Sequence, residues 1–296
     1  MERVLRCSAL ICLLALAGTA AAGEPGTADL LVLQSPAFPG RLSMGAAGFA
    51  LAGGPDAVFG NPAMLTAGFA AGGGRWNLGT TSAAAAGAFG LGGGLRGAAG
   101  FRYLGRGDMT GRDEYGAQTG VYSYGTGLMA GGFSGDFAPG LSWGASMAVA
   151  WEKIDAETGT GFSANLGMRA RTDAGLRAGL ALRGLGQAPS WDGIRKDMPI
   201  TLDAGAEMPV SDRLDLFAGG QLGFSTSSAG SAGLRGSVSG LGLSCGYTLG
   251  EEEETSGVFG GLSYRYRAAE TYTVEIATSQ RDVLDWPVLA GLTVVF

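Results

Sequence analysis

The chain contains no histidine, and this absence excludes several kinds of chemistry. Catalysis by a Ser-His-Asp triad and metal binding through imidazole both require that residue. Cysteine is also rare, since Cys7 and Cys12 lie close to the amino terminus and only Cys245 remains beyond it. One cysteine forms no intrachain disulfide, and structural zinc sites need several cysteine or histidine ligands. We therefore expect no catalytic residue, no metal site and no cofactor, and predict that the protein is not an enzyme.

Charge and long apolar runs are scarce as well. Charged residues make up 16% of the chain, and the formal net charge is −6. Domains that bind nucleic acid are usually basic, so we expect no nucleic-acid partner. No run of 18 apolar residues follows the amino terminus, so the sequence predicts no transmembrane helix. Glycine, by contrast, is abundant at 56 of 296 residues, without the three-residue period of collagen.

The first 22 residues have the three parts of a secretory signal peptide. Arg3 and Arg6 form a positively charged start, residues 9–17 form an apolar run, and three alanines at 20–22 form a cleavage site. We predict that this segment exports the chain and is then removed.

From residue 72 onward, apolar side chains alternate with small or polar ones. Between Trp143 and Trp151, for example, apolar residues fill every second position, and glycine, serine and alanine fill the others. Each pattern persists for about nine to eleven residues, the length of a tilted strand that crosses a bilayer. Strands of soluble sandwiches usually have about five or six residues. The last strand, 287–296, ends on the aromatic Phe296, like the closing strand of a bacterial outer-membrane barrel.

Long and short connections alternate when they are counted back from Phe296, and the count reaches fourteen strands. Short turns at the periplasmic end and long loops at the outer end are typical of membrane barrels. We predict an all-β fold, a transmembrane antiparallel up-and-down β-barrel of about 14 strands with a short amino-terminal plug segment. The predicted divisions are a signal peptide at 1–22, a periplasmic linker and plug or hatch segment at 23–71, and the barrel at 72–296.

Two tryptophans on one apolar face are candidates for an aromatic girdle. Trp143 and Trp151 lie eight residues apart. This spacing corresponds to about 26 Å along a strand, which after tilting approaches the distance between the two girdles of a membrane barrel. The alternative is that they are two unrelated core residues.

Charged residues on the opposite faces are predicted to point into the lumen, because a charge facing lipid near the midplane costs about 2–4 kcal/mol. They could form an anion-attracting passage or a ladder of salt bridges that holds the interior. On this face assignment we expect Leu180→Arg to hinder membrane insertion and Arg183→Ala to be tolerated. The candidate lumen charges are Arg96, Arg102, Arg169, Arg177, Arg183, Glu207 and Arg265.

Residues 41–65 read RLSMGAAGFALAGGPDAVFGNPAML and depart from the strand pattern. Asn61 can cap a helix and Pro62 suits its first position, so a short helix is expected there. The ordered string resembles the PorV/PorQ-like (UPF0164-type) outer-membrane proteins, a family related in fold to FadL. The residues that carry the resemblance are Arg41, Met44, Gly45, Asp56, Phe59, Asn61, Pro62 and Ala63.

The resemblance implies that this segment lies inside or beneath the barrel as a plug, with either a gating role or a purely structural one. It also implies residence in the bacterial cell outer membrane, with the surrounding lipid as a partner. Passive transport or handling of hydrophobic small molecules is the leading function that it implies. The alternatives are an adaptor or shuttle that works with partners of a type IX-like protein secretion system, and a structural barrel without transport.

Overall fold

The computed structural model describes residues 30–191, 194–195, 197–251, 256–280 and 286–296. The predicted signal peptide at 1–22 lies outside these residues. None of the helices in the described part of the chain is long and apolar enough to span a membrane.

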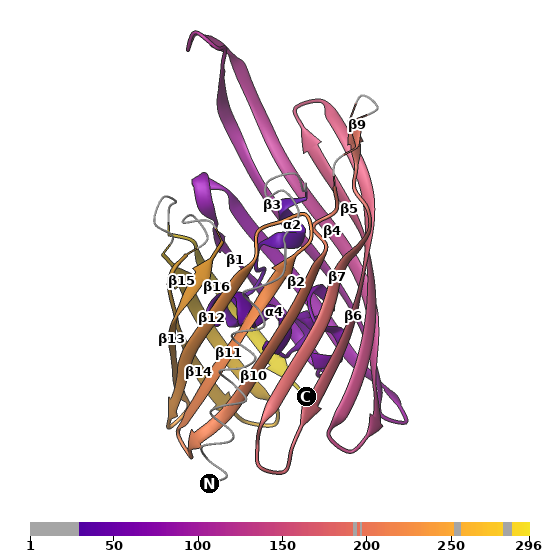
Figure 1. The fold of residues 1–296 in the computed structure, drawn as a ribbon, viewed down its shortest axis with the longest axis vertical. Helices are drawn as coiled ribbons and strands as arrows, with labels where there is room; N and C mark the ends of the chain where they lie inside the picture. Colours follow the sequence, from indigo (N-terminus) through magenta and orange to yellow (C-terminus); the bar gives the residue numbers. More distant parts are fainter. Residues whose placement is uncertain (1–29, 192–193, 196, 252–255, 281–285) are drawn as a thin grey trace.

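Fourteen antiparallel strands form one closed barrel, as predicted (Figure 1). Each strand pairs with its neighbours along the chain, and β1 pairs with β16 from Gly68 opposite Val295 to Arg75 opposite Val288, which closes the barrel. The strands are β1 (Gly68–Arg75), β2 (Thr81–Gly92), β3 (Leu95–Arg112), β4 (Gln118–Ala138), β5 (Leu141–Ile154), β6 (Glu157–Arg171), β7 (Arg177–Gln187), β10 (Thr201–Ser211), β11 (Leu214–Gly223), β12 (Ala229–Val238), β13 (Leu241–Gly250), β14 (Gly257–Arg267), β15 (Thr271–Ser279) and β16 (Val288–Val295).

The two ends of the barrel differ in their connections. Tight turns such as Ser239-Gly240 lie at one end, which we call the short-turn end, together with the start of β1 and the end of β16. The other end, the long-loop end, carries the longer connections and a small hairpin of β8 (Ser190–Trp191) and β9 (Ile194–Arg195).

Two expected connections are in fact strand. The glycines and charged residues of 105–119 interrupt the period of two and predict a long loop, but β3 and β4 continue as a tall hairpin beyond the rest of the wall (Figure 1). Residues 135–140 were expected to form another, yet β4 reaches Ala138. The first two strands also begin earlier than expected, at Gly68 and Thr81. In all these places glycine, alanine and charged residues hide the alternation, while backbone pairing continues without it.

The outer surface of the barrel is apolar and the lumen wall is made largely of small residues. Along β2, Ala84, Ala86 and Ala88 point inward and are buried. An apolar outer face with small residues on the lumen side is typical of membrane barrels, in which lipid-facing and lumen-facing residues alternate along each strand. Large apolar side chains on the outer face include Met129, Met147, Val149, Leu166, Leu180, Leu243, Leu262, Val274 and Ile276, each more than 40% exposed.

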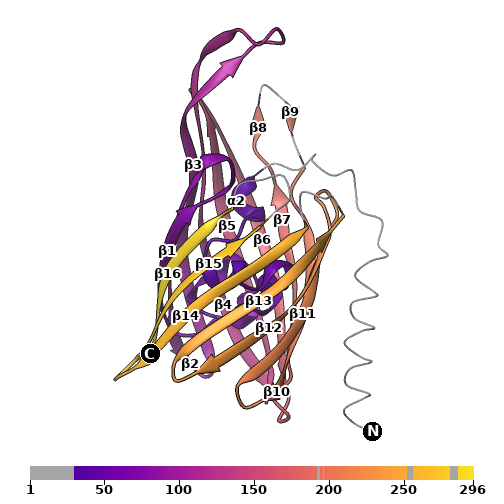
Figure 2. The same ribbon diagram turned by 90° about the vertical axis from the view of Figure 1, so that its left-hand side faces the viewer.

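The amino-terminal residues 30–65, here called the plug segment, lie inside the lumen (Figures 1 and 2). Their short helices lie against every strand of the barrel, and Val32, Met44, Val58 and Leu65 are fully buried there. The helices are α2 (Leu31–Gln34), α3 (Pro39–Leu42), η1 (Gly45–Ala47), α4 (Gly48–Leu51), η2 (Pro55–Phe59) and η3 (Pro62–Met64).

Glycines in the wall allow the plug segment to approach the strands closely. A Cβ at Gly179 would lie 2.1 Å from the Ala50 carbonyl oxygen, and one at Gly144 would lie 2.5 Å from the Pro62 carbonyl carbon. Real side chains do not reach such distances from backbone, so these positions accept only glycine while the plug segment keeps its place.

Candidate functional site

A buried ion pair joins two parts of the plug segment that lie 15 residues apart. Arg41 Nε lies 3.3 Å from Asp56 Oδ2, and Arg41 Nη2 donates to the Asp56 carbonyl oxygen. Burial raises the pKa of the Asp56 carboxyl, an effect that the Arg41 guanidinium opposes. Burial also lowers the pKa of the Arg41 guanidinium. Both residues belong to the string that carries the family resemblance, and together they fold the segment back on itself.

Asn61 holds the end of the plug segment in three directions. Its Oδ1 accepts from Ala63 N at 3.1 Å, so it caps η3 as predicted, with Pro62 at the first helical position. Its Nδ2 donates to the carbonyl oxygens of Ala50 at 3.0 Å and Met168 at 3.1 Å. The last bond reaches β6, so Asn61 connects two parts of the plug segment to the wall.

The remaining residues of the string fill space inside the barrel. Met44 and Ala63 are fully buried, and Phe59 stacks on Phe38 with ring centres 6.3 Å apart. Gly45 has φ +56°, and a Cβ there would lie 2.5 Å from Ser231 Oγ on β12, so glycine is required by both conformation and space.

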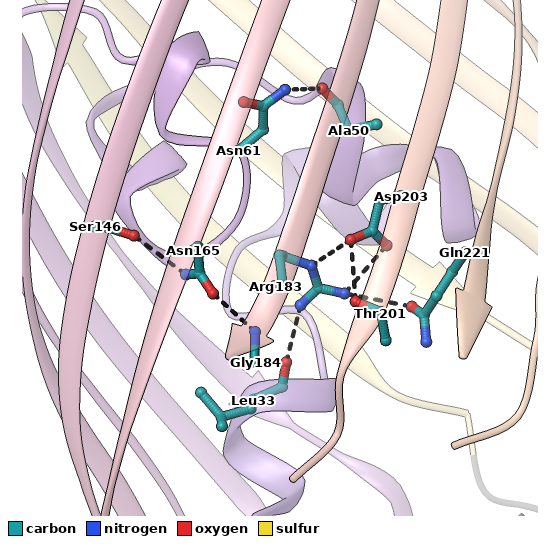
Figure 3. A network of polar contacts seen from close by, with 10 residues as sticks. All are labelled: Leu33, Ala50, Asn61, Ser146, Asn165, Arg183, Gly184, Thr201, Asp203 and Gln221. Atoms are coloured by element: carbon teal, nitrogen blue, oxygen red, sulfur yellow. Dashed lines mark hydrogen bonds and ion pairs between the residues drawn. The ribbon is translucent and has the colours of Figure 1, made fainter. Parts of the chain in front are cut away.

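Arg183 of β7 forms the centre of a second polar network (Figure 3). Its Nε lies 2.6 Å from Asp203 Oδ2 on β10, and the same carboxylate accepts from Thr201 Oγ1. Its Nη1 donates to the Leu33 carbonyl oxygen at 3.1 Å. Its guanidinium also lies 3.8 Å from the centre of the Phe49 ring, a cation–π contact. The wall therefore holds both α2 and α4 through one side chain.

Arg102 of β3 makes a similar attachment from another part of the wall. It is 2% exposed, and its two terminal nitrogens donate to the Val32 carbonyl oxygen and to Ser35 Oγ. Arg102 and Arg183 thus bind successive carbonyl groups of α2, those of residues 32 and 33.

The other predicted lumen charges form separate groups near the short-turn end. Glu207 lies 2.8 Å from Arg177 and 3.3 Å from Arg235. A second group surrounds Asp136, which lies 3.3 Å from Arg96 and 3.7 Å from Arg169. Arg265 lines a cavity described below.

Sequence reasoning missed three residues that complete these groups. Asp136 was placed in a connection, although it lies on the lumen side of β4 and receives two arginines. Arg235 was missed because the strand around it, β12, is mostly glycine, serine and alanine. Phe49 had no visible signal, since an aromatic residue in a helix is ordinarily a core residue.

Two cavities lie on opposite sides of the plug segment. The upper cavity, of about 310 Å³, lies towards the long-loop end, and its lining includes Leu42, Phe49 and Trp76. The lower cavity, of about 370 Å³, lies towards the short-turn end and is polar, with Arg235, Arg265 and Glu275 in its lining. The helix α3 separates them, since Pro39 and Ser43 at its two ends line the lower cavity and Leu42 lines the upper one.

The two candidate girdle tryptophans both lie on the outer face of β5. Trp143 meets Phe133 edge to face, with ring centres 5.5 Å apart. Trp151 lies near Phe101 with ring centres 6.0 Å apart. The outer face therefore carries an aromatic pair at each end of this strand, and neither tryptophan points into the lumen.

A scan against protein-family models and a search of curated proteins each gave no match. Solved structures do match along most of the chain. The Pseudomonas putida toluene transporter TodX aligns at a TM-score of 0.63 and 13% identity, over 94% of this chain and 98% of that one. The CymD monoaromatic hydrocarbon channel aligns at 0.61 and 12%, over 88% and 97%. A Pseudomonas aeruginosa FadL homologue aligns at 0.59 and 10%, over 88% and 97%. This chain therefore has the fold of the FadL-like and TodX-like barrels.

Proposed function

We propose that the protein is a passive, non-enzymatic channel for hydrophobic small molecules in the bacterial outer membrane. The observation that carries the proposal is a closed barrel, apolar outside, whose plug segment separates two cavities that lie towards opposite ends. The similar structures include a toluene transporter and a monoaromatic hydrocarbon channel, and this supports the same class of activity here.

In this proposal the plug segment is the gate. The four-residue helix α3 has residues in the linings of both cavities, so a shift of α3 would connect them. Against the wall, α3 packs on β14, β15 and β16. The Glu275 carboxylate of β15 lies beside Gly40 of α3, since a Cβ built there would lie 3.2 Å from it.

A disulfide between plug segment and wall tests the gate. Ala46 N donates to Ser231 Oγ at 2.7 Å, so cysteines at these two positions come within disulfide reach. The variant Ala46→Cys/Ser231→Cys is built with Cys245→Ser, which removes the free cysteine of the described residues, while Cys7 and Cys12 lie in the predicted signal peptide. Uptake of radiolabelled toluene is measured in bacteria that lack other channels of this kind. We expect uptake to fall when the disulfide forms and to recover on reduction.

Two results would argue against transport. Uptake equal to that of cells without the protein would exclude a channel for such molecules. If the oxidised variant instead transports as well as the reduced one, the segment around Ala46 is not the moving part. The adaptor role in secretion would be favoured if cells without the protein take up toluene as well as cells with it but no longer release a secreted protein into the medium.

A further inference from the structure

The described lining of the upper cavity lacks the cation that would bind a hydrophobic acid. Among the described residues that line it, none carries a charge. Apolar surface comes from Leu31, Leu42, Phe49 and Trp76, and the remaining side chains are mostly amides and hydroxyls. The neutral hydrogen-bonding residues in the lining are Gln34, Ser35, Asn77, Thr80, Gln221, Thr226, Ser227, Thr248, Ser279 and Gln280.

Three nearby arginines do not offer a counter-ion to a ligand in this cavity, and a fourth, Arg106 beside Gly79 of the short helix η4 (Asn77–Gly79), does not belong to the described lining. Arg183 lies behind the Phe49 ring and is neutralised by Asp203. Arg41 is on the same ring, 5.8 Å from its centre, and is paired with Asp56. Arg102 is enclosed, with both terminal nitrogens bonded to the plug segment. A carboxylate in the cavity would lose its hydration without gaining an ion pair, which is strongly unfavourable.

Asn77 and Ser279 both line the cavity and each has a buried side-chain oxygen without a partner among the described residues, and Asn77 Oδ1 is the one that can only accept. Asn77 lies in η4 between β1 and β2, is 7% exposed, and lines the cavity. Its Oδ1 is buried and accepts no hydrogen bond from the described part of the chain. An unsatisfied buried carbonyl is costly, so a donor brought beside it gains more than the same donor would in water. The asparagine χ2 torsion is soft, so a small rotation turns Oδ1 towards a ligand.

We propose that the upper cavity selects uncharged, compact hydrophobic molecules that carry one O–H or N–H donor, such as simple phenols, and that Asn77 Oδ1 accepts this donor. The proposal rests on the channel function and names its substrate class. The volume of about 310 Å³ suits a single substituted ring. Aromatic contact comes from Phe49 and Trp76, while the neutral wall disfavours the corresponding acid.

Binding of three molecules of nearly equal size tests this selection. They are 4-methylphenol, toluene and 4-methylbenzoate, titrated at pH 7 by calorimetry into the folded protein in detergent. We expect 4-methylphenol to bind about three- to tenfold more tightly than toluene, the gain of one neutral hydrogen bond, and 4-methylbenzoate to bind most weakly. Tightest binding of the benzoate would overturn the proposal, as would equal binding of the phenol and toluene.

Variants identify the acceptor. Asn77→Leu should reduce 4-methylphenol affinity to that of toluene and leave toluene affinity unchanged. Ser82→Ala is the matched control, since Ser82 Oγ is another buried atom without a partner on the same hairpin but does not line the cavity. It should keep the preference for the phenol. If Asn77→Leu also keeps the preference, Asn77 is not the acceptor and the proposal fails. If no molecule binds the wild type and toluene uptake is absent, the channel function itself fails.

Discussion

The Arg183 guanidinium lies 3.8 Å from the centre of the Phe49 ring, so a charged side chain of the barrel wall covers an aromatic side chain of the plug segment. The same arginine binds Asp203 and the Leu33 carbonyl oxygen. The arginine therefore holds the plug segment in place, and Phe49 itself lines the upper cavity. The predictions below test this attachment, the orientation of the wall and the fit between wall and plug.

Arg183→Ala should be strongly destabilising, which revises the tolerance expected from the sequence. The change leaves Asp203 buried and without its cation, a loss of about 3–5 kcal/mol when one partner of a buried pair is removed. Urea unfolding in lipid vesicles measures the free energy of unfolding. Arg265→Ala is the control, because that side chain is exposed, lines the lower cavity and attracts Glu275 without a close ion pair among the described residues, so it should change stability by much less, about 0.5 kcal/mol. Equal stability of the two variants would contradict the structural role of Arg183.

Leu180→Arg should hinder membrane insertion. Leu180 is 43% exposed on the outer face of β7, and an arginine facing lipid near the midplane costs about 2–4 kcal/mol. The folded fraction after refolding into vesicles can be read from the heat-dependent shift on a gel. Leu180→Phe keeps the position apolar and should fold like the wild type. Normal insertion of the arginine variant would mean that the outer face of β7 does not contact lipid.

Arg41 and Asp56 should behave as a coupled pair. Arg41→Met or Asp56→Asn alone leaves a buried partner, so each should destabilise the protein by about 3–5 kcal/mol. The double variant removes both charges and should be more stable than the sum of the single changes predicts, with a coupling of about 0.5–3 kcal/mol. Proteolysis of the plug segment provides a second measurement, since each single variant should be cut faster. Strict additivity would show that the pair does not act as a unit.

Gly179→Val should displace the plug segment while the barrel still forms. A Cβ at Gly179 would lie 2.1 Å from the Ala50 carbonyl oxygen, whereas one at Gly87, on the outer face, meets nothing within 4 Å. Single-channel conductance in planar bilayers should therefore rise for Gly179→Val and stay unchanged for Gly87→Val. A closed Gly179→Val channel with normal folding would show that the plug segment can retreat without opening a passage.

The sequence by itself determined the barrel. An apolar outer face and a packed lumen impose a period of two on most strands, and this local signal predicted the strand number and the outward face of residues such as Leu180. The capping of η3 by Asn61 was also readable, because it depends on adjacent residues. The PorV/PorQ resemblance, the signal peptide, the outer-membrane location and the secretion role stay predictions.

Only the tertiary structure decided which charges meet and what the plug segment does. Arg183 meets Asp203 because β7 and β10 pair in one register, and it meets Leu33 because the plug segment follows one path through the lumen. Neither the register nor the path leaves a periodic trace in the sequence. The two cavities, and the Asn77 Oδ1 atom that has no partner among the described residues, also result from tertiary packing. A cavity is the space that distant segments leave unfilled when they pack.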